Sequence, residues 1–286
     1  MKAYLDCVPC FVRQGLELVR TTTNDESRQE EALREMLLAI SRIDLSQSPP
    51  RMGQILHRVA RTLLDNEDPY RQIKNRSNAL ALKLYPELKS ITANSSDPFA
   101  TTVGLSIAGN IIDSAVKSSL SEADVRQSIQ ESLDRPVRGD LERFRRAVSE
   151  AADILYLADN AGEIVFDRLL IELLPYEKVT VVVRGRPIIN DATLVVAETA
   201  GLTALVEVID NGSDAPGTIL EDCSSAFQER FRQADLVIAK GQGNYETLSE
   251  IDKTIFFLLK VKCRVIAART GYRIGDPALV SPARLP

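Results

Sequence analysis

The sequence contains a single histidine and no tryptophan, and the shortage of histidine excludes several kinds of catalytic centre. A zinc site built mainly from histidines cannot form. A Ser-His-Asp or Cys-His centre would have to use His57. His57 lies in a pattern typical of a helix, without a catalytic partner nearby in the sequence. We therefore expect His57 to lie on the surface of a helix.

Long apolar runs and an excess of positive charge are also absent. No run approaches the roughly 20 apolar residues that a membrane helix needs, and the first residues lack the apolar core of a signal peptide. The formal net charge of −5 provides no basic excess for binding a nucleic-acid backbone. We expect a cytoplasmic protein that binds neither membranes nor nucleic acids.

Cysteine is scarce, with four residues in all: Cys7, Cys10, Cys223 and Cys263. In a reducing cytoplasm these are expected to be thiols rather than structural disulfides. Cys7 and Cys10 form a C-x-x-C motif, which is half of a zinc site unless two further ligands fold close to it. A packing role and a metal or redox role both stay open for this motif, although a redox pair usually follows a strand in a thioredoxin-like unit.

Two regions with different patterns divide the 286 residues, which are enough for one large domain or two smaller ones. Residues 1–150 show the apolar spacing of helices. Residues 151–286 alternate short apolar runs with helical patterns, which indicates a mostly parallel sheet covered on both faces. We predict an α/β fold, an α/β/α sandwich with a Rossmann-like sheet, preceded by a helical region. The expected strands are Ile154–Ala158, Val179–Val183, Leu205–Ile209, Leu236–Ala239 and Val265–Ala268, and Thr254–Val261 fits either a strand or a buried helix.

Several helix boundaries in the first region follow from local chemistry. Asp97-Pro98 is typical of an N-cap followed by proline at the first helical position. Ser121-Glu122-Ala123-Asp124 resembles a capping box, with aspartate in place of the usual glutamate. The helical pattern from Ile73 to Leu84 is expected to end at Pro86.

Polar residues follow three of the expected strands. Asp159 and Asn160 come directly after the first strand, and Asp191 lies where a helix begins after the second. Lys240 comes directly after the run that ends at Ala239. Because parallel strands end at the same edge of a sheet, where ligands bind, we expect these side chains to converge.

The chemistry of this set suits a divalent metal and a phosphate. Two carboxylates and an amide oxygen form an incomplete shell for Mg²⁺ or Mn²⁺, and tolerate Co²⁺ or Ni²⁺. Lys240 and the backbone N–H groups freed by Gly241 and Gly243 suit a phosphate. The alternative is that Asp159 or Asn160 only caps the next helix and that the glycines only form a turn.

A helical segment before the sheet carries a further polar face. Asn110 and Asp113 are three residues apart, so they share one face of a helix. Gly109 would let another backbone or a ligand approach closely. We expect this face to form part of the wall of the ligand site. The alternative is that both side chains simply face solvent.

Several stretches of the chain, in a characteristic order and spacing, run from residue 6 to residue 263. They are Asp6-Cys7-Val8-Pro9-Cys10 with Arg13-Gln14, Asp68-Pro69-Tyr70, Gly109-Asn110-Ile111-Ile112-Asp113, Asp159-Asn160-Ala161-Gly162-Glu163, Asn190-Asp191-Ala192-Thr193, Lys240-Gly241-Gln242-Gly243-Asn244-Tyr245-Glu246, and Leu258-Leu259-Lys260-Val261-Lys262-Cys263. In these stretches the chain resembles the damage-control phosphatase family long catalogued as domain of unknown function 89, in its prokaryotic branch with an N-terminal C-x-x-C.

The resemblance implies metal-dependent hydrolysis of phosphate from small phosphorylated metabolites, often damaged or surplus ones. It implies that Asp159, Asn160 and Asp191 ligate the metal and that Lys240 contacts the phosphate. The resemblance assigns no role to the C-x-x-C motif.

The predicted phosphate site also includes the backbone from Gly241 through Gly243 to Asn244. Glu163 or Glu246 would orient the attacking water. Two other functions compete with the phosphatase: a non-catalytic protein that binds a phosphorylated metabolite in the same crevice, and a methyltransferase, an activity also proposed within the wider family. The first strand ends in Asp-Asn rather than in a glycine-rich cofactor loop, which counts against the methyltransferase.

Overall fold

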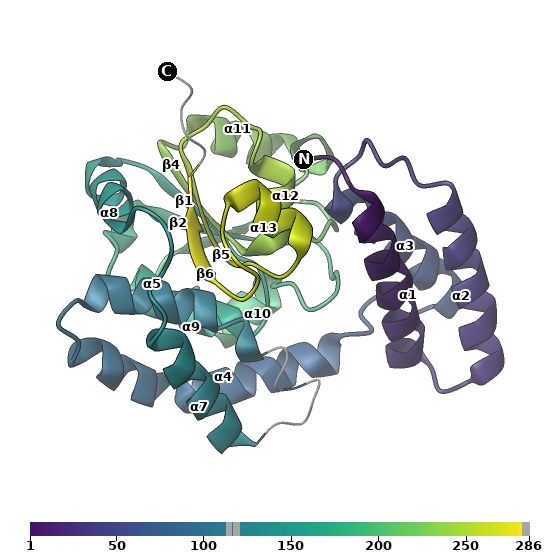
Figure 1. Ribbon diagram of the computed structural model, residues 1–286, viewed down its shortest axis with the longest axis horizontal. Helices are drawn as coiled ribbons and strands as arrows, with labels where there is room; N and C mark the ends of the chain where they lie inside the picture. Colours follow the sequence, from purple (N-terminus) through teal and green to yellow (C-terminus); the bar gives the residue numbers. More distant parts are fainter. Residues whose placement is uncertain (113–115, 117–120, 282–286) are drawn as a thin grey trace.

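Six strands form one sheet at the centre of the molecule (Figure 1). They are β1 (Ile154–Leu157), β2 (Val179–Val183), β3 (Glu207–Asp210), β4 (Leu236–Lys240), β5 (Ile255–Lys260) and β6 (Pro277–Val280). This computed structural model describes residues 1–112, 116 and 121–281. Asp113, part of the predicted polar face, therefore lies outside the described residues.

The strand order is β3-β2-β1-β4-β5-β6. The direction in which successive strands are added to the sheet therefore reverses between β1 and β4. From β1 the chain builds β2 and β3 on one side, then returns to add β4 on the other side of β1. All neighbouring pairs are parallel except β5 and β6. Open α/β sheets bind ligands beside the carboxyl ends of the two strands at such a reversal. We therefore expect a ligand site among the residues that follow β1 and β4.

The predicted strands are confirmed with one exception. Val265–Ala268 was expected to be a strand, but it lies within the helix α13 (Arg264–Thr270). A short apolar run can be a strand or one side of a buried helix, and its pattern alone does not distinguish them. The ambiguous segment Thr254–Val261 contains β5 instead.

Alternate residues of β1 face two separate apolar cores, as the period of a strand requires. Ile154 and Tyr156 belong to one core, and Leu155 and Leu157 to the other. The first core is covered by α4 (Arg71–Ala93), α5 (Pro98–Ala108), α7 (Glu122–Leu133), α8 (Leu141–Glu150), α9 (Glu163–Ile171) and α10 (Leu194–Thr199). The second is covered by α11 (Ser225–Gln233), α12 (Gly241–Leu248) and α13. The predicted α/β/α sandwich is confirmed.

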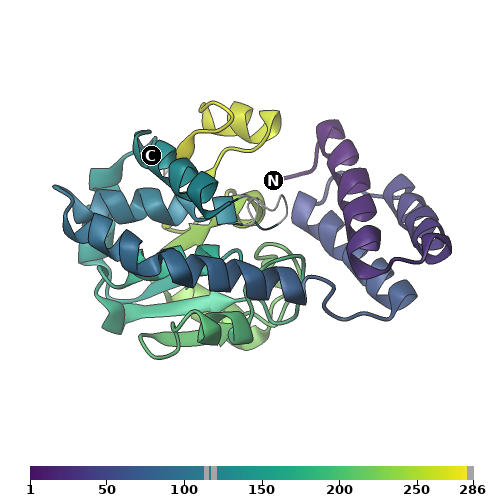
Figure 2. The ribbon, with the colours of Figure 1, turned by 90° about the horizontal axis from the view of Figure 1, so that it is seen from below.

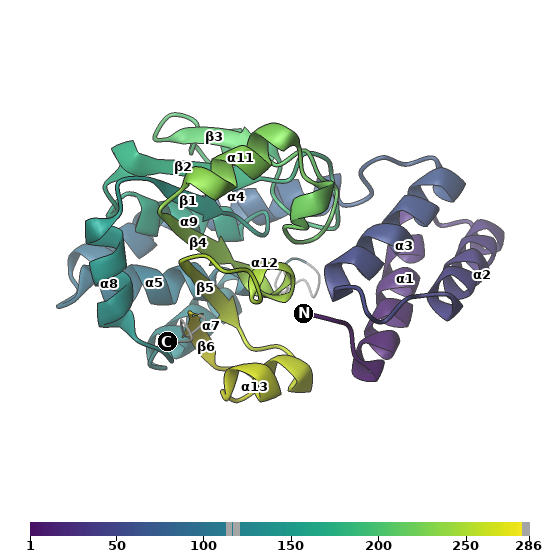
Figure 3. The same ribbon diagram turned by 90° about the horizontal axis from the view of Figure 1, so that it is seen from above.

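Three N-terminal helices form a unit with its own apolar core. They are α1 (Val8–Thr22), α2 (Glu26–Ser41) and α3 (Pro49–Leu64). Figures 1 and 3 show them side by side at one end of the molecule, with α12 between α3 and the sheet in Figure 3. In Figure 2 the long α4 runs across the near side of the α/β body toward them. The helices α4, α5, α7 and α8 also precede β1 in the chain, but they pack on the sheet and belong to its core rather than to that of α1, α2 and α3.

Local chemistry sets the helix starts as expected, but Pro86 does not end α4. The Asp97 carboxylate accepts a hydrogen bond from the Ala100 N–H (3.0 Å), and Ser121 forms the predicted capping box. The helix α4 continues through Pro86 to Ala93. Leu84 and Leu88, on either side of the proline, are both buried in the sheet core, and this packing offsets the hydrogen bond that proline removes.

His57 is buried in α3, which corrects the expectation of a surface position. Its ring lies 6.1 Å from that of Tyr70, centroid to centroid. Burial lowers the pKa of His57 to about 3, so the ring is neutral near pH 7 and serves packing.

Within the described part of the chain, no helix combines the length and apolar character that crossing a bilayer requires.

Candidate functional site

The turns after β1 and β2 are joined by backbone hydrogen bonds at the carboxyl edge of the sheet. The Ala192 N–H donates to the Asp159 carbonyl oxygen (2.7 Å), and Asn160 and Asp191 form an isolated antiparallel bridge. Asp159, Asn160 and Asp191 are thereby brought together, as their positions at the strand ends predicted. They are 8%, 7% and 3% exposed.

These three side chains line a cavity of about 610 Å³. The helical N-terminal region forms part of its wall through α1 and α3, which contribute Cys10 and Gly53 among others. Residues 262–265, which lead from the segment after β5 into the first residues of α13, form another part. The cavity therefore lies between the sheet edge and the separate unit of α1, α2 and α3.

Hydrogen bonds orient the Asn160 amide. Its Nδ2 donates to Asp159 Oδ2 (2.8 Å) and to Glu163 Oε2 (3.0 Å). The nitrogen is therefore committed to protein acceptors, and the carbonyl oxygen is the atom of this side chain that suits a cation. A hydrogen bond also orients the Asp191 carboxylate, because its Oδ2 accepts from Arg184 Nε (2.8 Å). Such supporting hydrogen bonds commonly orient the ligands of metal sites.

Arg184 is a site residue that the sequence interpretation missed. It follows β2 directly and is 2% exposed. Its Nη2 lies 3.7 Å from Asp159 Oδ1, and its Nη1 donates to Asn244 Oδ1 (3.3 Å). The guanidinium thus lies between the two aspartates. The signal available in the sequence was its position at a strand end, the same signal that identified Lys240.

The charge balance of the set favours an added cation. Burial raises the pKa of Asp159 well above its usual value, and the Asp191 and Glu163 carboxylates raise it further. Burial also raises the pKa of Asp191, although Arg184 opposes this. A divalent ion beside these groups would favour their ionised forms.

The donor set fits a hard divalent ion only if the amide is included. Asp159, Asp191 and the Asn160 carbonyl are oxygen donors of the kind that Mg²⁺ and Mn²⁺ prefer. Across residues 1–112, 116 and 121–281, no three His, Cys, Asp or Glu side chains are grouped to hold a metal by themselves. The remaining coordination positions would belong to water and substrate.

Lys240 is buried behind this set and does not line the cavity, so its placement does not fit the predicted phosphate contact. Its Nζ donates to Glu163 Oε1 (2.6 Å), Asp167 Oδ1 (2.6 Å) and the Ser106 carbonyl (2.9 Å). Burial alone would lower the pKa of Lys240, but the two carboxylates raise it to about 12. The ammonium would have to break these bonds to reach a ligand.

The two glutamates proposed to orient water differ in position. Glu163 is 2% exposed and bonded to Lys240 and Asn160. Burial would raise the pKa of Glu163, but Lys240 outweighs that effect and lowers it. Glu246 lines the cavity, and burial raises its pKa to about 7. Of the two, Glu246 has the position to meet a water, whereas Glu163 positions Asn160.

The residues after β4 support the site more than they face the cavity. Gly241 has φ +77°, and a Cβ there would overlap the Asp159 carboxylate, so glycine permits this close approach. Asn244 is fully buried, and its Nδ2 donates to the Lys240 carbonyl (2.8 Å). Gly243 lines the cavity. The predicted phosphate-binding backbone thus meets the cavity at Gln242 and Gly243.

The polar face on the segment after α5 packs against protein. Asn110 donates through Nδ2 to Glu163 Oε2 (3.3 Å), and its side chain lies outside the lining of the cavity. A Cβ at Gly109 would lie 3.2 Å from the Glu163 Cα and 3.0 Å from the Phe166 Cβ. The close approach permitted by Gly109 is therefore that of α9. The expectation that Asn110 faces a ligand does not fit this placement.

The C-x-x-C motif lies in the cavity wall. Cys7, Cys10 and Cys263 all line the cavity, and Cys7 Sγ accepts from the Tyr4 N–H (3.5 Å). Burial raises the pKa of Cys7. Cys223 is instead buried in the second sheet core, where burial raises its pKa to about 12. The chain thus gathers thiols beside the aspartates, which the spacing of the cysteines did not predict.

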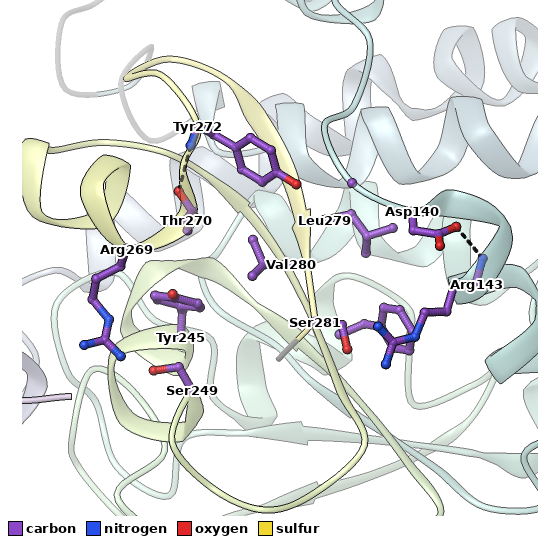
Figure 4. Close-up of a pocket in the computed structure, with 12 residues that line it drawn as sticks. Asp140, Arg143, Tyr245, Ser249, Arg269, Thr270, Tyr272, Leu279, Val280 and Ser281 are labelled. Atoms are coloured by element: carbon purple, nitrogen blue, oxygen red, sulfur yellow. Dashed lines mark hydrogen bonds between the residues drawn. The ribbon is translucent and has the colours of Figure 1, made fainter. Parts of the chain in front are cut away.

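A second cavity, of about 390 Å³, lies near β6 (Figure 4). Its carboxylate, Asp140, is used as a helix cap, because Oδ1 accepts from the Arg143 N–H (2.8 Å). Arg143 and Arg269 approach the cavity from different helices. Without a pair of carboxylates in its described lining, this cavity lacks the donor set of the first.

Comparisons with known proteins agree over nearly the whole chain. The family model described as the damage-control phosphatase ARMT1-like domain matches residues 3–277. Proteins named damage-control phosphatase are 35% identical in Archaeoglobus fulgidus, over 94% of this chain and 96% of that protein, and 35% identical in Pyrococcus horikoshii, over 93% of each. An uncharacterized protein of Methanocaldococcus jannaschii is 36% identical, over 96% of this chain and 94% of that protein.

The fold of this chain is also similar to that of a solved structure. The crystal structure of a DUF89 family protein from Pyrococcus horikoshii superposes with a TM-score of 0.91 and 32% sequence identity. The superposition covers 99% of this chain and all of that one, 100%.

Proposed function

Because the chain belongs to the damage-control phosphatase ARMT1-like family, we propose that it is a metal-dependent phosphatase that hydrolyses small phosphorylated metabolites. One observation carries the proposal: Asp159, Asn160 and Asp191 meet at the edge of a cavity of about 610 Å³. The cavity is large enough for a small phosphorylated molecule beside the ion, and it adjoins the strand reversal where α/β sheets bind ligands.

Asp159, Asn160 and Asp191 would hold a divalent ion, which is Mn²⁺, Co²⁺, Ni²⁺ or Mg²⁺. When bound, the ion polarises a phosphoryl oxygen and lowers the pKa of a water. Glu246, whose pKa burial raises to about 7, would accept a proton from the attacking water at its carboxylate. Its Oε1 accepts a hydrogen bond from Gln242 Nε2 (2.8 Å), which holds the carboxylate in place.

The buried residues behind the centre would hold its geometry. Lys240 holds Glu163, Glu163 accepts from the Asn160 amide, and Arg184 holds Asp191. We assign Lys240, Glu163 and Arg184 a positioning role. Changes to them would act on metal affinity and stability before they act on the phosphoryl group.

The test is a phosphate-release assay on a panel of phosphorylated metabolites, with each of the four ions in turn. Asp191→Ala should lose bound metal and activity while staying folded, and Asp191→Asn keeps the shape of the side chain as a second variant. Asp210→Ala is the matched control, because Asp210 ends β3 at the same sheet edge but is exposed. Full metal occupancy in Asp191→Ala by elemental analysis would contradict the proposed site. Metal-dependent ligand binding without turnover would favour the non-catalytic alternative.

A further inference from the structure

We propose that Cys7 and Cys10 form a reversible thiol–disulfide site in the wall of the cavity. The reaction partner is a low-molecular-weight disulfide from solution. Oxidation of the pair changes the cavity wall that faces Asp159 and Asp191 and lowers phosphatase activity until the pair is reduced again. The chemistry of the thiols goes beyond the proposed function, whereas its effect on activity rests on that function.

The two thiols lie at the start of one helix. A short 3₁₀ turn, η1 (Leu5–Cys7), leads into α1, so Cys7 occupies the N-cap and Cys10 the third helical position. Side chains at these two positions approach one another, as they do in a capping box. Three residues of helix also separate two Cα atoms by a distance that a disulfide can span. The pair can therefore close without moving the unit of α1, α2 and α3 relative to the sheet.

The two cysteines have different surroundings, which give them different roles. Cys10 is exposed, and Arg13 Nη2 donates to its Sγ (3.8 Å). An exposed thiol beside a cation is the usual setting of a reactive cysteine. Cys7 is half-buried, its Sγ accepts from the Tyr4 N–H (3.5 Å), and burial raises its pKa. Cys10 is thus the thiol that an incoming disulfide meets first, and Cys7 is the thiol that completes the reaction.

The reaction consists of two thiol–disulfide exchanges. The Cys10 thiolate attacks one sulfur of the external disulfide, which forms a mixed disulfide and releases a thiolate that takes up the proton lost by Cys10. The Cys7 thiolate then attacks Cys10 Sγ, which closes the internal disulfide and releases the second external thiol with the proton lost by Cys7. The external disulfide gains the two electrons that the cysteine pair loses, and an excess of external thiol reverses both exchanges.

A third thiol and the proposed general base lie near the pair. Cys263 Sγ accepts from Gln242 Nε2 (3.9 Å), and the same nitrogen donates to Glu246 Oε1 (2.8 Å). Besides burial, the charges of Glu246 and Cys263 raise the pKa of Cys7, so both groups are close enough to act on it. Oxidation of the pair therefore takes place beside Glu246, the residue proposed to accept a proton from the attacking water.

Both oxidised forms change the cavity. The mixed disulfide places its adduct at the wall of a cavity of about 610 Å³, where it competes with a substrate for space. The internal disulfide draws Cys10 toward Cys7 and shifts the start of α1, the helix that also lines the cavity through Phe11 and Gln14. We therefore expect turnover to fall on oxidation and to return on reduction.

The experiment uses the full chain, reduced and treated with chelator, with oxidised glutathione as the probe and peptide mapping by mass spectrometry as the measurement. In the wild type we expect a disulfide between Cys7 and Cys10, with Cys223 and Cys263 still reduced. Cys10→Ser should lose this reaction. Cys7→Ser should stop at a stable glutathione adduct on Cys10, because the second thiol is gone. Cys223→Ala is the matched control and should react as the wild type does, because Cys223 is buried in the second sheet core.

Activity is then measured with metal restored and p-nitrophenyl phosphate as the substrate. Each protein is compared with its own reduced form, so that any effect of a substitution on turnover itself cancels. The wild type and Cys223→Ala should lose turnover after oxidation and regain it after treatment with excess reduced glutathione. Cys10→Ser should keep the same turnover before and after exposure to oxidised glutathione.

The outcomes separate this inference from the proposed function. A disulfide between Cys7 and Cys263, an adduct that forms first on Cys263, or four reduced cysteines after treatment would overturn the thiol–disulfide site. A Cys7–Cys10 disulfide that leaves turnover unchanged would overturn its effect on activity. If the reduced wild type hydrolyses no ester with any ion, the proposed function fails, and the peptide map still tests the thiol–disulfide site.

Discussion

Replacing Lys240 by methionine tests whether this lysine stabilises the fold or acts on the substrate. Methionine keeps much of the length and apolar bulk of lysine but removes the charge. The side chain of Lys240 is 0% exposed, and those of its partners Glu163 and Asp167 are 3% and 0% exposed. The substitution would leave two buried carboxylates without their cation, which is the costly way to break a buried ion pair.

The expected size of the effect follows from that geometry. Removing one partner of a buried pair commonly costs about 3–5 kcal/mol. For a chain of this size each kcal/mol lowers Tm by about 2–4 °C, so we expect a fall of about 6–20 °C. Lys83→Met, at an exposed lysine paired with Glu122 on the surface, is the control and should leave Tm nearly unchanged.

The pH dependence gives a second test of the same reasoning. Burial raises the pKa of Asp167 to about 6 even though Lys240 opposes this rise. Without the lysine, Asp167 should bind a proton at still higher pH, which removes the unpaired charge. The stability lost in Lys240→Met should therefore be smaller at pH 5 than at pH 8. Lys240→Met combined with Asp167→Asn should recover part of the loss at pH 8, as a double-mutant cycle would show.

The assay is thermal unfolding followed by circular dichroism, with chelator present so that metal binding does not contribute. Phosphate release is measured on the same preparations with metal restored. A Tm within about 1 °C of the wild type, together with a large loss of turnover, would refute the structural role of Lys240. That result would return the lysine to the phosphate contact that its motif suggested.

Two further predictions concern a glycine and an aspartate. Gly241→Ala should lose bound metal and phosphatase activity, because its Cβ would overlap the Asp159 carboxylate at φ +77°; Gly271→Ala, at φ +75° in open space, should cost only about 1–2 kcal/mol and keep activity. Equal metal content in the two variants, by elemental analysis, would contradict this. Burial would raise the pKa of Asp214, but bonds from Arg58, Gln54 and Arg61 outweigh it and lower the pKa to about 2. The stability that Asp214 contributes is thus present above about pH 4 and lost toward pH 2. The free energies of unfolding of the wild type and Asp214→Asn, measured in urea, should therefore converge over this range. A constant difference between them would refute the prediction.

Local and periodic features of the fold could be predicted from the sequence, because they depend on neighbours along the chain. The Asp97 cap and the Ser121 capping box need only side chains that reach nearby N–H groups. The convergence of Asp159 and Asp191 needed only the inference that both follow parallel strands, whose carboxyl ends share one edge. These features do not depend on how the layers pack.

Which side chains face the cavity was decided by the tertiary structure. Lys240 ends β4 two residues after Ile238, so both point to the sheet face covered by α9. The alternation was present in the sequence, but the carboxylates that receive the ammonium, on Glu163 and Asp167, are brought there by the packing of α9. Lys262 follows the next strand after one intervening residue, and it remains in the cavity because its ammonium is not enclosed by a packed layer.

The same distinction explains the helix and the thiols. The pattern of Val265–Ala268 fits a strand or a helix, and in the folded chain it forms part of α13, with Ile266 packed in the second sheet core. Cys7 and Cys10 reach the cavity because the start of α1 lies beside the edge of the sheet. The strands that form this edge are far from α1 in the sequence. The chain by itself therefore determined the elements and the shared edge. The tertiary packing decided which charges were buried and which were left to bind a ligand, because burial depends on contacts between segments that are distant in sequence.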